Sequence, residues 1–207
     1  MTEPAIHWVL FDFGGVVAEE GFRAGLDFLA RHHGRDPEQV LAHAMDAVYA
    51  SGYVTGTGSE ADFWRELGER TGLWPDPLEG RQAIFARFRL RPWVLDWVRR
   101  LRAAGYGVGL LSDQTDWLEQ LDRRDGFLAE FERVYNSFRL GKGKRDPALF
   151  TQVAADLGVA PANILFIDDA APNLERARTQ GYRTLLFTGR EPLEAALGAL
   201  VAGDAGA

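Results

Sequence analysis

The chain has 207 residues, which suits one domain or one core domain carrying a smaller insertion. Hydrophobic residues make up 46%, which excludes an intrinsically disordered chain, and the sequence contains no cysteine for disulfides or thiolate metal sites. The net charge of −7 argues against a nucleic-acid partner. The first residues lack the features of a signal peptide and no apolar run is long enough for a membrane span, so we expect a cytoplasmic protein.

Residues 6–17 read I-H-W-V-L-F-D-F-G-G-V-V, an apolar run that leads to Asp12 and then to Gly14 and Gly15. Such a run predicts a strand that is buried on both faces, as in a parallel sheet. Asp12 would then lie at the carboxyl end of this strand, where open α/β sheets bind their ligands. The glycines allow a sharp turn and a close approach of the backbone to whatever Asp12 holds.

Residues 19–88 differ from the rest of the chain because their apolar residues recur at helical spacing and do not alternate as in a strand. Residues 51–58 interrupt this region, and Ser59-x-x-Asp62 after them resembles a capping box at the start of a helix. A second interruption at residues 72–77 precedes the last helix of the region. We therefore predict a small all-helical module that is inserted after the first strand.

From Arg91 onward, helices and strands alternate. The expected helices are residues 92–105, 115–124, 146–158, 172–181 and 191–200, and the expected strands are residues 106–112, 134–137, 164–167 and 182–187. This alternation predicts an α/β fold with a doubly wound parallel sheet. The Rossmann-like core would comprise residues 1–18 and 89–207, with residues 19–88 as an inserted helical cap.

Polar groups follow the predicted strands at their carboxyl ends: Asp12, Ser112, and the pair Asp168-Asp169, with Lys142 and Lys144 in a loop after a further strand. Because the carboxyl ends of parallel strands share one edge, we expect these groups to converge in one crevice. Carboxylates without cysteine or histidine partners suit Mg²⁺, and a hydroxyl and an ammonium beside the ion suit a phosphoryl group. Asp12 would be available as a nucleophile that forms an aspartyl-phosphate.

Each of these groups also has a purely structural explanation. Ser112 is placed to cap the helix that follows it, Asp168-Asp169 to cap the helix at Pro172, and the two lysines to lie in a solvated loop. Their order favours a joint site, because four such groups each follow a strand of the same predicted sheet.

Four motifs in this order resemble the haloacid dehalogenase superfamily, most of whose members are phosphatases. The motifs are F-D-F-G-G-V-V at 11–17, G-L-L-S-D at 109–113, G-K-G-K-R-D-P-A-L-F at 141–150 and I-L-F-I-D-D-A-A-P-N at 164–173. The resemblance covers nearly the whole chain and includes the position of the helical cap. It is strongest to the subgroup with a small four-helix cap, which includes α-D-glucose-1-phosphate phosphatase and the phosphatase half of soluble epoxide hydrolase.

The resemblance implies roles for individual residues. Asp12 would attack phosphorus and bind Mg²⁺, with the Gly14 carbonyl and Asp168 as further metal ligands. Ser112 and the backbone of Asp113 would hold the phosphoryl oxygens.

Lys144, which has the family spacing to the following helix, would neutralise the phosphate and the nucleophile, with Lys142 as a spare.

Three positions depart from the family pattern. Gly14 replaces a second Asp that acts as general acid and base, a function worth ~10²–10⁴ in rate, so we expect a slow phosphatase unless a cap residue or a substrate hydroxyl supplies the proton. Arg145 replaces a proline in the lysine loop. Asp113 replaces an asparagine and adds negative charge near the phosphate, which weakens binding unless its side chain turns away or the ion offsets it.

We therefore predict a Mg²⁺-dependent phosphatase of a small phosphorylated metabolite, such as a sugar phosphate, acting without nucleic acid or membrane as a monomer or homodimer. A metal-independent 2-haloacid dehalogenase and a catalytically weak protein that binds a metabolite or partner are the alternatives. The intact Asp168-Asp169 pair favours the metal and hence phosphate. Candidates to line the substrate pocket, if they are not core residues, are the cap aromatics Tyr49, Tyr53, Trp64 and Phe85.

Overall fold

The computed structural model describes residues 5–204 and is built around a five-stranded sheet. The strands are β1 (Trp8–Phe11), β2 (Gly107–Ser112), β3 (Arg133–Asn136), β4 (Ile164–Asp168) and β5 (Arg183–Leu186), in the spatial order β3-β2-β1-β4-β5. All neighbouring strands pair in parallel. The predicted doubly wound parallel sheet is therefore confirmed.

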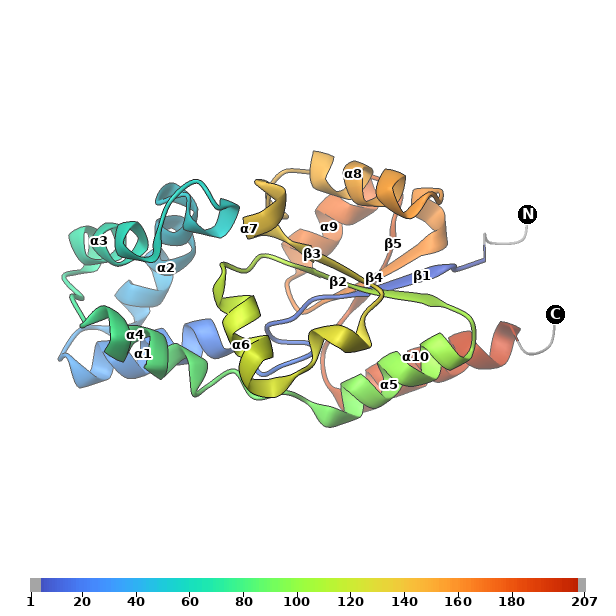
Figure 1. Ribbon diagram of the computed structural model, residues 1–207, viewed down its shortest axis with the longest axis horizontal. Helices are drawn as coiled ribbons and strands as arrows, with labels where there is room; N and C mark the ends of the chain where they lie inside the picture. The colour runs from blue at the N-terminus through green and yellow to red at the C-terminus, as the bar shows by residue number, and fades with distance from the viewer. Residues whose placement is uncertain (1–4, 205–207) are drawn as a thin grey trace.

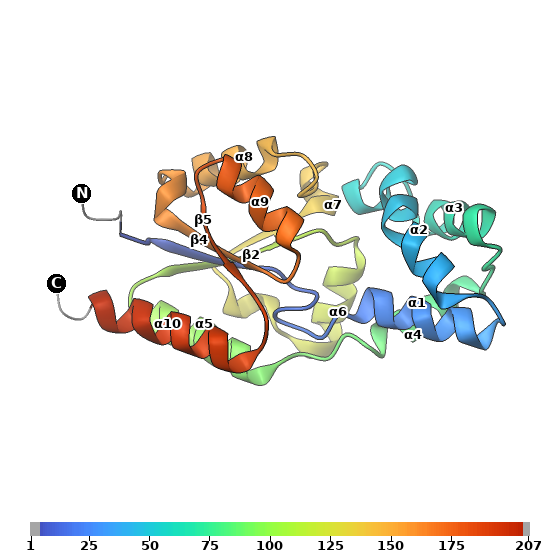
Figure 2. The same cartoon turned by 180° about the vertical axis from the view of Figure 1, so that it is seen from behind.

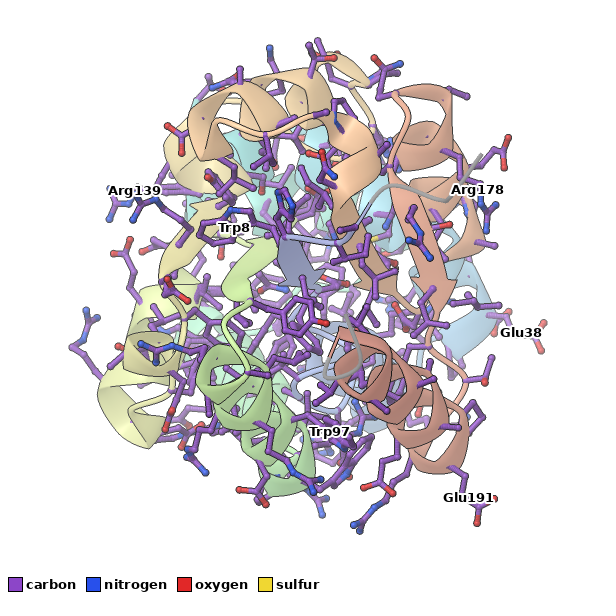
Figure 3. All side chains as sticks on the ribbon, turned by 90° about the vertical axis from the view of Figure 1, so that its right-hand side faces the viewer. Trp8, Glu38, Trp97, Arg139, Arg178 and Glu191 are labelled. Carbon is purple, nitrogen blue, oxygen red and sulfur yellow. The ribbon has the colours of Figure 1, made fainter. Side chains whose placement is uncertain are left out.

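Helices cover both faces of the sheet. They are α1 (Gly21–His32), α2 (Pro37–Ala50), α3 (Glu60–Thr71), α4 (Pro77–Phe85), α5 (Pro92–Ala103), α6 (Trp117–Asp125), α7 (Ser137–Leu140), α8 (Ala148–Leu157), α9 (Ala171–Thr179) and α10 (Arg190–Asp204). In Figures 1 and 2, α8 and α9 lie on one face and α5 and α10 on the other. Figure 3, viewed from the end opposite the helical lobe, shows the buried Trp97 between α5 and α10. No helix within residues 5–204 combines the length and apolarity needed to cross a membrane.

The helices α1 to α4 form a lobe of their own beyond the carboxyl ends of the strands (Figure 1). The Ser59 hydroxyl accepts a hydrogen bond from the Asp62 N–H, and the Asp62 side chain accepts one from the Ser59 N–H, so the predicted capping box begins α3. The chain enters and leaves the lobe through adjacent segments, since the Glu19 N–H donates to the Arg89 carbonyl over 2.8 Å. The lobe is thus an excursion between two neighbouring points of the core.

The strand β1 lies at the centre of the sheet, at the point where the order of the strands along the chain changes direction. Residues Val9, Leu10 and Phe11 of β1 are fully buried, as the apolar run predicts. Connections from β1 lead to β2 and β3 on one side, whereas β4 and β5 lie on the other. A crevice forms at such a reversal because the flanking connections go to opposite sides, so the carboxyl ends of β1 and β4 mark the place for a ligand.

One helical turn was missed from the sequence. Ser137, expected in a strand, begins α7 instead, because the Asn136 side chain accepts a hydrogen bond from the Phe138 N–H over 3.1 Å and caps the turn. Polar side chains that bond nearby backbone groups in this way favour helix starts over strands. The Ser137 hydroxyl instead donates to the Val54 carbonyl over 2.7 Å and so joins the core to the helical lobe.

Candidate active site

Asp12 follows β1 at the chain reversal, and its carboxylate is held through one oxygen. Oδ1 accepts hydrogen bonds from the Phe13 N–H at 2.7 Å and the Ser112 hydroxyl at 2.6 Å, and it lies 2.8 Å from Lys144 Nζ. Among residues 5–204, no donor contacts the second oxygen, Oδ2. Because Asp12 lines the cavity described below, Oδ2 is the oxygen available to a ligand.

Lys144 connects the two strand ends. Its ammonium lies 2.7 Å from Asp168 Oδ2 as well as 2.8 Å from Asp12 Oδ1, and its side chain is 1% exposed. Asp168 is fully buried and also accepts a hydrogen bond from the Ala170 N–H at 2.7 Å. The amide of Asn173 lies 3.2 Å from Asp168 Oδ2. Both carboxylates and the ammonium are therefore fixed in orientation without water between them.

Burial and charge act against each other in this cluster. Burial raises the pKa of Asp12 to about 7, with Lys144 opposing the rise and the Asp168 charge adding to it. For Lys144, burial lowers the pKa, but the charges of Asp12, Asp168 and Asp113 outweigh this effect and leave it raised. Lys144 thus stays protonated, and the cluster has an excess of acidic groups that additional positive charge would stabilise.

A third carboxylate completes an oxygen-rich group. Carboxylate oxygens of Asp12, Asp168 and Asp169 lie within 4.8 Å of one another. A set of oxygen donors with more negative than positive charge fits a hard divalent cation such as Mg²⁺. Gly14, whose carbonyl the family resemblance assigns to the metal, lines the same cavity. Gly15 has a φ of +89°, and a Cβ there would lie 2.2 Å from Asp169 Oδ2, so the turn requires glycine.

Asp113 has its carboxylate turned toward the protein. Oδ1 accepts a hydrogen bond from the Lys144 N–H at 2.8 Å, and Oδ2 accepts one from the Tyr49 hydroxyl of α2. A Cβ on Gly143 would lie 2.4 Å from the Tyr49 hydroxyl oxygen, so this approach depends on glycine at that position. The extra acid that follows Ser112 thus anchors both the lysine loop and the helical lobe.

The replacement of proline by Arg145 also connects core and lobe. Its guanidinium lies 2.9 Å from Asp46 Oδ1 and 4.1 Å from the centre of the Tyr49 ring. Lys142 lies outside the cluster, with its ammonium 3.8 Å from Asp146 Oδ2. The two lysines of the loop therefore differ sharply in environment.

A cavity of about 310 Å³ opens between the cluster and the helical lobe. Its core side includes Asp12, Gly14, Ser112, Asp113, Lys144 and Asp169, and its lobe side includes Phe22, Arg23, Met45, Val48, Tyr49 and Val54. Of the four aromatics expected to line a substrate pocket, Tyr49 does so. The other three pack around a core residue, Trp117, with ring-centre distances of 5.6 Å for Tyr53, 6.3 Å for Trp64 and 5.8 Å for Phe85.

Two further features escaped sequence reasoning. Trp117 at the start of α6 is 2% exposed and receives the lobe aromatics, and its indole N–H donates to Glu60 of α3 over 3.3 Å. Arg91 donates to three carbonyls of the turn after β1, those of Gly15, Val16 and Ala18, at 2.7 to 2.9 Å. Both depend on contacts between distant segments, for which the local sequence carries no pattern.

Comparison with known proteins identifies the family. A model of haloacid dehalogenase-like hydrolases matches residues 6–181. The chain belongs to this family. Its fold class, and the family resemblance drawn from the four motifs, are thereby confirmed.

The relatives of this haloacid dehalogenase-like hydrolase include phosphatases. D-ribitol-5-phosphate phosphatase of Bacteroides thetaiotaomicron is 26% identical, with 85% of this chain and 89% of that protein covered. Enolase-phosphatase E1 of Acidiphilium cryptum is 34% identical, with 87% and 83% covered. A magnesium complex of a haloacid dehalogenase family enzyme from Bacteroides thetaiotaomicron has the same fold, with a TM-score of 0.71, 23% identity and 91% and 96% covered. The protein is therefore a hydrolase of a phosphatase-like type.

Proposed function

We propose that this hydrolase is a Mg²⁺-dependent phosphatase that acts on a small phosphorylated metabolite through an aspartyl-phosphate on Asp12. The observation that carries the proposal is the position of Lys144, whose ammonium lies within 2.8 Å of carboxylate oxygens of both Asp12 and Asp168 at the sheet edge. Such a cluster suits the transfer of a highly charged group, because catalysis of phosphoryl transfer depends mainly on positioning and charge neutralisation.

The nucleophile is Asp12, which lines the cavity and whose Oδ2 is contacted by no donor within residues 5–204. Oδ2 attacks phosphorus and displaces the ester oxygen, and a water molecule then attacks the same phosphorus and releases phosphate. The Ser112 hydroxyl and the Lys144 ammonium hold Oδ1, so that Oδ2 keeps its direction. Lys144, the Asp113 backbone and Ser112 are the contacts we assign to the phosphoryl oxygens, and the single proton of the Ser112 hydroxyl would turn from Asp12 Oδ1 to the phosphoryl group when the substrate binds.

Mg²⁺ would be held by carboxylate oxygens of Asp12 and Asp168 and by the Gly14 carbonyl. When bound, the ion supplies positive charge that offsets the charge of the phosphoryl oxygens. The proximity of three carboxylates, within 4.8 Å, supports this assignment. The magnesium complex of the structurally similar enzyme is consistent with it.

Residues 19–88 are the cap in this proposal, and the cavity size limits the substrate. A volume of about 310 Å³ is in the range of small-molecule binding sites. The names of the two related phosphatases support a phosphorylated small molecule as substrate. Gly14 cannot transfer a proton, so turnover depends on another group that protonates the leaving oxygen and deprotonates the attacking water.

Two features of the site disfavour the two alternative functions. A metal-independent 2-haloacid dehalogenase is disfavoured because the carboxylates of Asp12, Asp168 and Asp169 lie within 4.8 Å of one another, while Lys144 contacts those of Asp12 and Asp168. A bound cation would offset the remaining negative charge. A binding protein without turnover is disfavoured by Asp12, which lines the cavity and keeps Oδ2 without a hydrogen-bond donor among residues 5–204, so that this oxygen is open to act as a nucleophile.

Hydrolysis of 4-nitrophenyl phosphate tests the proposal. We expect phosphate release that requires added Mg²⁺ and is abolished by chelator and by Asp12→Asn. Chelator-insensitive release of halide from a 2-haloacid would instead establish the dehalogenase. The absence of turnover on both compounds, with Mg²⁺ binding retained, would favour the binding protein.

A further inference from the structure

The space beside Gly14 is bordered by the side chain of Glu20. A Cβ built on Gly14 would lie 3.9 Å from Glu20 Oε1, 3.6 Å from Gln114 Nε2 and 3.4 Å from Phe88 Cε1. The carboxyl oxygens of an aspartate at position 14 would be two bonds beyond that Cβ. Glu20 Oε1 therefore borders the volume that an aspartate carboxyl would occupy.

The side chain of Glu20 is held in this position because it caps a helix. It directly precedes α1, and its Oε2 accepts a hydrogen bond from the Arg23 N–H over 2.7 Å. This bond caps the helix and anchors one oxygen of the carboxyl group. The side chain lines the cavity together with Asp12 and Gly14.

Other acidic groups of the cavity are committed elsewhere. Both oxygens of Asp113 accept hydrogen bonds, from the Lys144 N–H and from Tyr49. Asp169 belongs to the group of carboxylates that suits a divalent cation, with oxygens of Asp12 and Asp168 within 4.8 Å. Gln114, which also borders the space beside Gly14, has no acidic proton.

We propose that Glu20 is the general acid and base of this enzyme, in place of the carboxyl group that Gly14 lacks. The proposal rests on the phosphatase function proposed above. As Asp12 attacks phosphorus and the bond to the ester oxygen breaks, Glu20 gives its proton to the departing oxygen. When water then attacks the aspartyl-phosphate, Glu20 takes a proton from it, the bond from phosphorus to Asp12 breaks, and phosphate leaves with the protein restored.

The environment of Glu20 favours a protonated starting state. Burial raises the pKa of Glu20, and the charge of Asp169 adds to the rise, while the hydrogen bond from the Arg23 backbone and the Arg23 charge oppose it. A carboxyl group with a raised pKa is a better proton donor near neutral pH than an exposed one, because more of it carries the proton.

Leaving-group dependence tests the proposal. Phenyl phosphate needs protonation of its departing oxygen, whereas 4-nitrophenyl phosphate needs it far less. For Glu20→Gln we expect kcat/KM to fall about 100-fold on phenyl phosphate and less than about 10-fold on 4-nitrophenyl phosphate. The glutamine amide oxygen can still accept the hydrogen bond from the Arg23 N–H, so the helix cap is retained.

Two comparisons separate catalysis from structure. Glu19→Gln, at the adjacent exposed position, should leave both rates unchanged. Adding Gly14→Asp to Glu20→Gln should restore the rate on phenyl phosphate, because the φ of Gly14 lies outside the left-handed region and its nearest contact to an added Cβ is an ordinary 3.4 Å.

An equal loss on both esters, or a double variant no faster than Glu20→Gln alone, would overturn the role of Glu20. If the wild-type enzyme with Mg²⁺ hydrolyses neither ester, the phosphatase proposal itself fails. The two failures are therefore distinguishable.

Discussion

The two walls of the cavity differ in how their side chains are held. On the core wall, Asp12 and Lys144 are buried and joined by an ion pair at 2.8 Å, and Lys144 also pairs at 2.7 Å with Asp168, which is fully buried. On the lobe wall, most of the side chains are apolar, including Phe22, Met45 and Val48. The charged groups at the carboxyl ends of the strands are thus held by one another, whereas the apolar side chains of the lobe wall carry no charge that such pairing could fix.

At the junction between the two walls, ring contacts and hydrogen bonds join the lobe to the core. Trp117 receives rings from the lobe, and hydrogen bonds join Tyr49 to Asp113 and Tyr53 to Asp116. Substitutions on the core wall should therefore act mainly on kcat, and substitutions at the junction mainly on KM and stability.

The largest effect is expected for Asp12→Asn, which removes the nucleophile without changing its size. We expect kcat to fall on the order of 10⁴-fold or more, because an amide at position 12 cannot attack phosphorus as the carboxylate does. Steady-state rates on an aryl phosphate at saturating Mg²⁺ measure this. A variant with more than a tenth of the wild-type rate would show that Asp12 is not the nucleophile.

Lys144→Met should lower both rate and stability. Loss of the ammonium should reduce kcat about 10²–10³-fold, as for removal of one charge-stabilising donor. It also leaves the buried carboxylates of Asp12 and Asp168 unpaired, which should cost about 3–5 kcal/mol in the free energy of unfolding. Urea titration and kinetics measure the two effects. The matched control is Lys142→Met in the same loop, which should change neither; equal effects of both would contradict the assignment.

Trp117→Ala tests the junction. Loss of a buried tryptophan should reduce the free energy of unfolding by about 3–5 kcal/mol and make the helical lobe more sensitive to protease. Trp74→Ala, at a position 57% exposed on the lobe surface, should cost less. If the two variants unfold at the same urea concentration, the lobe is not held by the contacts of Trp117.

The smallest effect is expected for Tyr49→Phe, which removes the hydroxyl that donates to Asp113. We expect a loss of about 1 kcal/mol in stability and a rise of a few-fold in KM with little change in kcat. Tyr135→Phe is the matched control, since that hydroxyl donates to Asp156 over 2.6 Å outside the cavity. A similar loss of stability is expected there without a change in KM, and a fall in kcat for Tyr49→Phe would contradict the division between walls.

The residues of the core wall could be predicted from the sequence because they follow the ends of strands. Parallel strands bring their carboxyl ends to one edge, so Asp12, Ser112 and Asp168 were expected to meet, and their side chains do lie together. The capping box at Ser59 was equally local. Such features depend on neighbours in the chain or on a rule that holds for every parallel sheet.

Which residues of the lobe line the cavity could not be predicted in the same way. Tyr53 and Trp64 were candidates for the pocket, but they pack against Trp117, because helical spacing gives the buried face of a helix and not its partner. The role of Arg91 at three carbonyls and the start of α7 at Ser137 likewise depend on tertiary contacts or on a single side-chain cap.

Trapping the intermediate tests the central claim most directly. The enzyme with Mg²⁺ and 4-nitrophenyl phosphate is quenched in acid during turnover, and its peptides are analysed by mass spectrometry. We predict a phosphoryl group on the peptide that contains Asp12, absent when chelator is added and absent from Asp12→Asn. Turnover without phosphoryl label on that peptide, or label on a different residue, would contradict the account.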